Sequence, residues 1–370
     1  MKIAQIAPLF ESVPPRTYGG TERVVHYLTE ELVRQGHQVT LFASGDSQTS
    51  AELWPTIPEA LRLAGEHRSL LAWHMLQLDT VARTAADFDI LHFHTDFWHF
   101  LLWRHMDQPQ LTTLHGRLDF PGLQPIFDRF QDMAVVSISH HQRAPLPRAR
   151  WVGTVYNGLP ENQYRFRAQP GDYLVFLGRF SPEKGPETAI EIAIRAGIPL
   201  KMAARVQWFD RQYFEQRIKP KLQHPGIEYL GEVDERGKNE LLGGALALLF
   251  PIDWPEPFGL VMIEAMACGT PVIAYPRGAV PEVMQDGVTG YIVDSVEAAV
   301  GALDRIEAID RAACRRHFEQ HFSARRMAER YVQIYRRLQY DTPTRGAGTG
   351  AHARTAGIRR ASRKGVPHER

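Results

Sequence analysis

Two glutamates in segment 250–274, Glu256 and Glu264, lie eight positions apart and give the chain its clearest chemical signal. Prolines on both sides of Glu256 disfavour helix there, so this carboxylate is expected on a loop. The Ala-, Met- and Leu-rich residues after Gly259 predict a helix that continues through Cys268. A helix N-terminus attracts anions, and carboxylates beside it can bind hydroxyl groups. The pattern therefore predicts a site for a ligand that carries both phosphate and several hydroxyls, which is the composition of a nucleotide-sugar.

The two glutamates alone leave a simpler interpretation open, in which Glu264 faces solvent and Glu256 complements the helix dipole. The residues that flank the two glutamates in sequence favour the ligand-binding interpretation instead. The loop Glu-Pro-Phe-Gly, the helix Leu-Val-Met-Ile-Glu-Ala-Met-Ala and the stop Gly-Thr-Pro-Val, within residues 256–272, resemble the signature of glycosyltransferase family 4. The resemblance implies a retaining enzyme of GT-B fold that uses a nucleotide-diphosphate sugar. The family's motif of two glutamates separated by seven residues is intact here.

The same resemblance implies a role for each residue of this segment. Glu264 would hold the ribose hydroxyls of the donor, and Glu256 would bind hydroxyls of the sugar. The backbone N–H groups of Phe258, Gly259 and Leu260 would orient sugar and phosphate. The pair thus resembles two ligand-binding groups rather than a general acid and a general base.

Two cations, Arg179 and Lys184, follow a predicted strand and precede a predicted helix. Fixed positive charge at such a place can stabilise a departing diphosphate, whose developing charge limits bond cleavage. Two surface cations could equally be solvated and without a role. However, the pattern Gly-Arg-x-x-x-x-Lys-Gly over residues 178–185 resembles the family's diphosphate-binding motif. We therefore expect both side chains to bind the donor diphosphate.

Paired glycines, Gly19 and Gly20, follow the first predicted strand and open the first predicted helix. They allow a tight turn and a close backbone approach to phosphate, although a purely structural turn fits as well. The pattern Gly-x-Gly-x-x-Gly is absent, which removes the main sequence support for a hydride-transfer dehydrogenase. The resemblance implies that this loop approaches the donor pyrophosphate.

Histidines end two neighbouring predicted strands. His92, His94 and Asp96 superficially resemble the zinc motif of metallo-β-lactamase hydrolases, but Phe97 replaces its last histidine. A hydrogen-bonded cluster beside the cleft is therefore expected in place of a metal site. His115 ends the next strand. A lone histidine there is usually structural, but the resemblance implies a position near the donor sugar in the reaction centre.

Length and composition set the broad class. A chain of 370 residues favours two domains, and 44% hydrophobic with 23% charged residues is ordinary for a globular protein. The net charge of +1 gives no case for nucleic acid as a specific partner. Only two cysteines occur, Cys268 and Cys314, so a reducing compartment is expected. Neither a signal peptide nor a membrane span is apparent. The expected location is the cytoplasm.

Strands and helices alternate along both halves of the chain, which predicts an α/β protein with two doubly wound, Rossmann-like domains facing each other across a cleft. The predicted division is an acceptor-side domain over 1–160, a nucleotide-sugar-binding domain over 161–322, a helix over 323–340 that packs back on the first domain, and a disordered basic tail over 341–370. The predicted strands cover residues 2–7, 38–43, 90–94, 110–114, 134–138, 152–156, 173–177, 200–203, 227–230, 245–250, 272–274 and 290–293.

The tail holds seven Lys or Arg against two acids. Weak electrostatic attachment to an anionic surface, such as lipid at the inner face of the membrane or RNA, is one interpretation. A solvated tail without a role is the interpretation that we favour.

Together these features predict a retaining hexosyltransferase that needs no metal or other cofactor, because Arg179 and Lys184 supply the positive charge. The donor would be a nucleotide-diphosphate sugar, and the acceptor a hydroxyl of a carbohydrate, lipid or small molecule. Lys201–Val206 departs from the glycine-containing strand end of many relatives. UDP-, GDP- and ADP-sugars therefore stay open, with the first two favoured. The alternatives are a phosphorylase or hydrolase on the same scaffold, a zinc hydrolase, or a non-catalytic nucleotide-sugar-binding protein.

Overall fold

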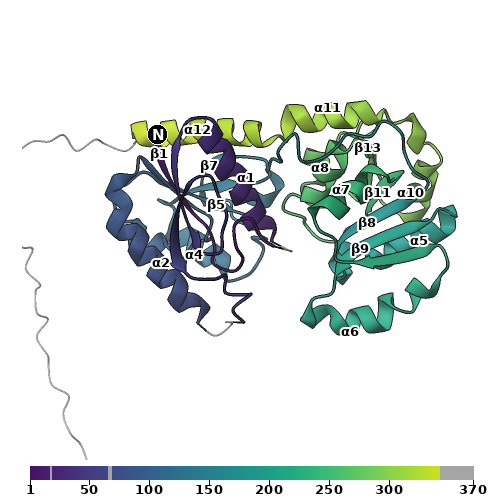
Figure 1. Ribbon diagram of the computed structural model, residues 1–370, viewed down its shortest axis with the longest axis horizontal. Coiled ribbons are helices and arrows are strands. Elements are labelled where there is room, and N and C mark those ends of the chain that lie inside the picture. The colour runs from purple at the N-terminus through teal and green to yellow at the C-terminus, as the bar shows by residue number, and fades with distance from the viewer. Residues whose placement is uncertain (17–18, 66–68, 342–370) are drawn as a thin grey trace, which may run out of the picture.

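The computed structural model describes residues 1–16, 19–65 and 69–341 and contains one parallel β-sheet in each half of the chain (Figure 1). Seven strands in the order β3-β2-β1-β4-β5-β6-β7 form the first sheet. These strands are β1 Lys2–Ile6, β2 Gln38–Ser44, β3 Glu52–Ile57, β4 Ile90–Phe93, β5 Gln110–Leu114, β6 Ala134–Ser137 and β7 Arg150–Thr154. Because all of them are parallel, their carboxyl ends meet at one edge of the sheet.

The second sheet has six parallel strands in the order β10-β9-β8-β11-β12-β13. They are β8 Leu174–Arg179, β9 Leu200–Arg205, β10 Ile227–Gly231, β11 Ala247–Phe250, β12 Val272–Ala274 and β13 Gly290–Ile292. The central strand β11 is buried along its whole length, as expected for a parallel sheet covered on both faces. Two doubly wound parallel sheets confirm the predicted fold class.

Helices connect the strands in both halves. In the first half they are α1 Gly20–Arg34, α2 Leu70–Thr84, α3 Phe100–Trp103 and α4 Leu123–Arg129. In the second half they are α5 Pro186–Ala196, α6 Arg211–Tyr213, α7 Glu235–Gly243, α8 Leu260–Ala267, α9 Val280–Val283, α10 Val296–Leu303 and α11 Arg311–His321. Three helices of the second half, α7, α10 and α11, have an Asp or Ser N-cap whose side chain accepts a backbone N–H, which satisfies a donor that the helix itself leaves unpaired.

The last helix, α12 Ala324–Asp341, lies along the first half of the molecule (Figure 1) and packs against α1. Tyr331 and Tyr335 reach from it to polar side chains of the first sheet. The chain crosses between the halves twice, and the two crossings touch. Leu159 and Ser323 form a parallel bridge there, flanked by backbone hydrogen bonds of 2.8 and 2.9 Å.

Three features differ from the sequence-based expectation. β3 was not predicted, because Pro55 lies inside it; the proline is tolerated because β3 is an edge strand that pairs only with β2. The sequence also predicts a continuous helix over residues 210–223, and this prediction is wrong. The segment consists of α6, a π-helical turn at Phe214–Ile218 and a short 3₁₀ turn, since Pro220 cannot continue an α-helix. The helix α11 was not predicted either.

Within residues 1–16, 19–65 and 69–341, no helix is both long and apolar enough to cross a membrane. Of the predicted basic tail, residues 342–370 lie outside the described residues.

Candidate active site

A pocket of about 670 Å³ opens between the carboxyl ends of the two sheets and takes its walls from both halves of the chain. This volume is in the range of sites for nucleotide-sized ligands. The ten residues that the sequence assigned to donor binding or the reaction centre all line it: Gly19, Gly20, His115, Arg179, Lys184, Glu256, Phe258, Gly259, Leu260 and Glu264. The structure therefore brings together residues that are up to 245 positions apart.

Glu256 lies on the irregular segment between β11 and α8, as predicted, and its side chain is nearly buried. Lys184 Nζ donates to Glu256 Oε2 at 2.5 Å and lies 4.4 Å from the centre of the Trp254 ring. The loop turns into α8 at Gly259, whose φ of +87° suits glycine and which forms the N-cap of the helix. Lys184 and Glu256 thus form one paired group at the pocket wall.

Arg179 ends β8 and lies among acidic and aromatic side chains. It forms an ion pair with Glu183, and its guanidinium lies 5.5 Å from the ring of Phe209. Arg179 Nε and Asp210 Oδ2 are 3.3 Å apart, yet neither atom completes a hydrogen bond with any described residue. Acidic partners hold this guanidinium at the pocket wall, where its positive charge can meet an anion.

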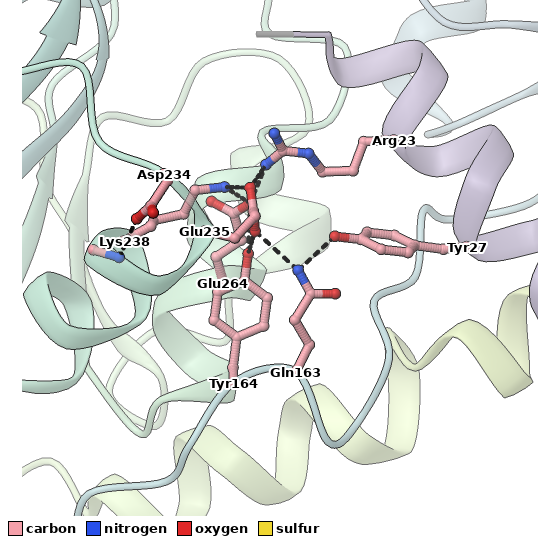
Figure 2. Close-up of polar contacts among 9 residues, drawn as sticks. Arg23, Tyr27, Gln163, Tyr164, Asp234, Glu235, Lys238 and Glu264 are labelled. Atoms are coloured by element: carbon pink, nitrogen blue, oxygen red, sulfur yellow. Dashed lines mark hydrogen bonds and ion pairs between the residues drawn. The ribbon is translucent and has the colours of Figure 1, made fainter. Parts of the chain in front are cut away.

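Glu264 lies inside α8 and forms the centre of the polar network in Figure 2. Its Oε1 accepts hydrogen bonds from Lys238 Nζ at 2.8 Å and from Tyr164 OH at 3.0 Å. Arg23 Nη1 lies 3.8 Å from the same oxygen. In the part of the chain that the structure describes, every contact of this carboxylate ends on Oε1, which leaves Oε2 available to a ligand.

The network continues across the cleft from α7 to α1. Arg23 of α1 forms an ion pair with Glu235 of α7, and Gln163 joins Tyr27 OH to Glu235 Oε2 through contacts of 2.6 and 2.9 Å (Figure 2). Burial alone would raise the pKa of Glu235, but Lys238 and Arg23 outweigh it and the pKa is lowered. The two halves therefore meet through a charged contact beside Glu264.

The glycine loop of the first half faces the helix of the second. A Cβ atom at Gly20 would lie 3.8 Å from Leu260 Cδ1, so the N-termini of α1 and α8 approach each other across the pocket. At Gly19 a Cβ atom would lie only 2.8 Å from Pro15 Cβ, so no other residue fits there without a shift. Two helix N-termini directed at one space favour a negatively charged ligand.

The histidines form a buried hydrogen-bonded cluster. His94 Nδ1 lies 2.8 Å from His115 Nε2, and His92 Nε2 lies 2.7 Å from Thr113 Oγ1. Burial lowers the pKa of His115 to about 4 and the pKa values of His92 and His94 well below their ordinary value. These rings make the side-chain hydrogen bonds that the sequence predicted for them, and Asp96 is not part of the cluster. No described group of three or more His, Cys, Asp or Glu side chains has an arrangement suited to a metal ion.

The first half of the chain also contributes a buried acidic side chain, Glu22, to the pocket wall. Burial raises the pKa of Glu22 to about 7, and the nearby carboxylate of Glu11 adds to this effect. A backbone hydrogen bond to Glu22 opposes this shift, and so does Arg62, which forms an ion pair with Glu11 at 2.5 Å. Glu22 is thus a buried carboxyl that can be neutral near physiological pH.

Sequence reasoning missed the partners of Glu264. Arg23 had a signal, since it lies three positions after the glycine loop on the first turn of α1. Lys238 and Tyr164 had none: a lysine on a short polar helix is usually solvated, and the contacts with Glu264 span 26 and 100 positions of sequence. Asn157, which with Gly158 forms a dipeptide typical of a turn between the halves, also lines the pocket.

Comparison with known proteins agrees with this geometry. The sequence profile of the family described as "Glycosyl transferases group 1" matches residues 163–320, and that of "Glycosyltransferase Family 4" matches residues 18–160. Among curated proteins, the chain is 25% identical over 334 residues to a phosphatidyl-myo-inositol mannosyltransferase of Mycobacterium leprae, covering 81% of this chain and 85% of that protein.

Solved structures share the fold. A sucrose-phosphate synthase from Thermosynechococcus elongatus superposes with a TM-score of 0.75 at 21% identity, over 92% of this chain and 99% of that one. The Anabaena protein HepE, solved with UDP and glucose, gives a TM-score of 0.70 at 18% identity, over 90% and 98% of the two chains. At these identities the likeness shows the GT-B fold alone. With both halves matched by family profiles, the chain belongs to the group 1 glycosyltransferases, glycosyltransferase family 4.

Proposed function

We propose that this glycosyltransferase moves a hexosyl unit from a nucleotide-diphosphate sugar, with UDP- and GDP-sugars favoured, to an acceptor hydroxyl and retains the anomeric configuration. The observation that carries the proposal is the single pocket in which two cations, two glutamates and a facing glycine loop meet. A diphosphate, a ribose and a sugar each find side chains of suitable chemistry there.

The donor diphosphate would lie against Arg179 and Lys184. Each of these cations already has an acidic partner, Glu183 and Glu256 respectively. Such pairing holds the side chains in place before the ligand arrives, so little ordering is needed on binding. The N-terminus of α8, at Phe258, Gly259 and Leu260, would orient the phosphate and sugar with backbone N–H groups.

The ribose would lie at Glu264. With Oε1 held by Lys238 and Tyr164, Oε2 is the oxygen that can accept hydrogen bonds from the ribose hydroxyls. Glu256 would bind hydroxyls of the transferred sugar, while His115 would face its anomeric region from the first half of the chain. Each role belongs to a residue that lines the pocket.

In the reaction, the bond between the anomeric carbon and the diphosphate oxygen breaks, and the acceptor oxygen forms its bond to the same face of that carbon. The acceptor proton passes to the departing phosphate oxygen, so charge and atoms balance without a protein nucleophile. Arg179 and Lys184 would stabilise the negative charge that develops on the diphosphate, the part that a metal ion plays in other transferases. Closure of the two halves would exclude water and favour transfer over hydrolysis.

The relatives support the donor class. HepE was solved with UDP and glucose, and the Mycobacterium leprae relative is described as a mannosyltransferase acting on phosphatidyl-myo-inositol. For this chain we propose an acceptor hydroxyl on a glycan, a glycolipid or a small molecule, bound on the side of the pocket that the first half provides. We also propose a cytoplasmic location for this protein. The two free, buried cysteines, Cys268 and Cys314, are consistent with such a reducing compartment.

A donor screen tests the proposal. Binding of UDP, GDP and ADP and of their sugars would be measured by thermal shift and calorimetry, and transfer would be followed by product analysis in the presence of EDTA. Lys184→Met should reduce kcat by roughly 10²- to 10³-fold. Lys219→Met is the matched control, because Lys219 is exposed and pairs only with Glu215 among the described residues.

Three outcomes would contradict the proposal. Product formation only with inorganic phosphate, or only with water as acceptor, would indicate a phosphorylase or hydrolase. Donor binding without turnover on any acceptor in a cell extract would indicate a binding protein. An inverted anomeric configuration of the product, read by NMR, would exclude the retaining mechanism.

A further inference from the structure

A buried chain of hydrogen bonds leads from the last helix to His115 in the pocket wall. Its members come from four separate elements or their ends, and all of them except His115 are almost completely buried. They are Gln5 on β1, His92 on β4 and His94 just after it, Thr113 on β5, and Tyr331 and Tyr335 on α12. Such a network is costly unless every polar group is satisfied, so its proton positions are constrained.

The orientation of the Gln5 amide determines the tautomer assigned to His115. Gln5 Oε1 can only accept, and it lies 2.7 Å from His94 Nε2, which must therefore carry the proton. In a neutral ring the other nitrogen, His94 Nδ1, is then an acceptor. It lies 2.8 Å from His115 Nε2, so His115 must donate from Nε2 and its Nδ1 must be unprotonated.

The remaining hydrogen bonds of the network are consistent with these donor and acceptor assignments. Gln5 Nε2 donates to Tyr335 OH at 3.2 Å, and that hydroxyl donates to His92 Nδ1 at 2.7 Å. His92 Nε2 then donates to Thr113 Oγ1 at 2.7 Å. With the amide of Gln5 in this orientation every donor in the chain meets an acceptor, and Gln5 Nε2 also lies 3.4 Å from His92 Nδ1. Burial keeps the rings neutral, as their lowered pKa values indicate.

We infer that Gln5 and His94 are positioning residues that hold His115 as the neutral tautomer with a bare Nδ1, so that it accepts a hydrogen bond from a hydroxyl of the bound sugar. His115 Nδ1 has no hydrogen-bond partner among the described residues, which leaves this atom to a ligand. The inference rests on the proposed function for the identity of the ligand. The inference excludes a role in which a protonated, positively charged His115 binds the diphosphate.

The first experiment needs no activity. The ring nitrogens of the full-length protein would be observed by ¹⁵N NMR at pH 7, with His115→Gln used to assign the signals. We expect a protonated Nε2 and an unprotonated Nδ1 at His115. A protonated Nδ1, or a doubly protonated ring, would overturn the inference. Addition of UDP-glucose or GDP-mannose, whichever binds, should shift the Nδ1 signal of His115 more than its Nε2 signal. An unchanged Nδ1 signal in the ligand-bound protein would also overturn the inference.

Paired substitutions of His94 separate positioning from packing. Asn places an oxygen where His94 Nδ1 accepts from His115, whereas Gln places its amide nitrogen where His94 Nε2 donates to Gln5. His94→Asn should therefore keep kcat within roughly threefold of the wild-type value. His94→Gln should reduce kcat roughly tenfold to hundredfold, because the hydrogen bond between residue 94 and His115 is lost, and should change the donor KM little. Equal kcat losses in the two variants would contradict the inference.

His99→Gln is the control for a general loss of stability. His99 is another buried histidine, at the N-terminus of α3, and it bonds Thr112 of β5 without touching His115. The control should have a lower Tm and an unchanged kcat. If the wild-type protein transfers no sugar, the proposed function fails, while the ¹⁵N spectra still decide the tautomer of His115. If either His94 variant does not fold, the spectra of the wild-type protein decide it as well.

Discussion

At the scale of single residues, Glu264 owes its position to charge partners that come from outside its own helix. Lys238 Nζ bridges Glu264 Oε1 and Glu235 Oε1 at 2.8 and 2.9 Å, and its side chain is only 8% exposed. A lysine buried to this extent is stable only because two carboxylates share its charge. It also holds one oxygen of Glu264 in place, which leaves the other for the ligand.

Removal of Lys238 is therefore expected to act on both stability and donor binding. Lys238→Met should lower the free energy of unfolding by about 3 kcal/mol, because the buried carboxylate of Glu264 loses its closest cation, whereas the partly exposed Glu235 keeps Arg23. It should also weaken UDP or GDP binding roughly tenfold, since Glu264 loses its fixed orientation. Urea denaturation and calorimetry would measure the two effects, and Lys238→Arg should restore part of both. Unchanged nucleotide affinity in a folded Lys238→Met protein would show that the lysine is structural only.

Glu22 predicts a pH dependence of stability. Its folded-state pKa is raised from 4.5 to about 7, so the folded protein holds a proton that the unfolded chain loses above pH 4.5. The stabilisation is complete below pH 4.5 and is lost as pH rises through 7, by up to about 3 kcal/mol. Glu22→Gln should thus match the wild type at pH 4.5 and be more stable at pH 8 in urea denaturation. The exposed Glu228→Gln should show no such trend, and a pH-independent effect of Glu22→Gln would refute the assignment.

At the scale of elements, the segment between β11 and α8 carries Glu256 without regular structure of its own. A second segment, at Gly278 and Ala279, packs against the backbone of Glu256. Ala279 N donates to Glu256 O at 2.9 Å, and a Cβ atom at Gly278 would lie 2.3 Å from both Glu256 N and Glu256 O. The position of the carboxylate therefore depends on the absence of a side chain 22 positions further along the chain.

Two glycine substitutions test this dependence. Gly278 and Gly287 both have left-handed φ values, +59° and +72°, so alanine at either position costs about 1 kcal/mol of backbone strain. Only at Gly278 does the new methyl group meet the Glu256 backbone, since the space around Gly287 is open. We expect Gly278→Ala to weaken donor binding at least roughly tenfold and Gly287→Ala to leave it unchanged. Equal donor affinities in the two variants, measured by calorimetry, would show that Gly278 does not position Glu256.

The elements themselves were largely predictable. Buried strands such as β5 and β12 were placed within the observed bounds because short apolar runs between turn residues are typical of parallel sheets. The site residues were predictable for a related reason: strand ends and helix N-termini of such a fold meet at one edge. The segment around Phe214 was predicted as part of one continuous helix, although Pro220 inside that range prevents an α-helix from continuing.

At the scale of the whole molecule, the two halves meet through a small number of specific contacts. Near the crossings, Glu282 of α9 accepts backbone N–H groups of His140 and His141 at 2.7 and 2.6 Å and the hydroxyl of Tyr156 at 3.1 Å. Beside the pocket, Arg23 pairs with Glu235 and approaches Glu264. None of these pairings was predictable from local sequence, because each joins residues more than a hundred positions apart.

The contact at Arg23 predicts a link between donor binding and domain closure. Glu264, the proposed ribose ligand, and Glu235 both belong to the second half, whereas Arg23 belongs to the first, so a closed pocket neutralises the acidic pair. Arg23→Gln should favour a more open molecule and weaken donor binding roughly tenfold. Small-angle scattering would report a larger radius of gyration without nucleotide and a smaller compaction on adding UDP or GDP. Arg34→Gln on the same helix is the control, since Arg34 pairs with Glu31 and is mostly exposed. Identical scattering and affinity for Arg23→Gln and the control would show that this contact does not control closure.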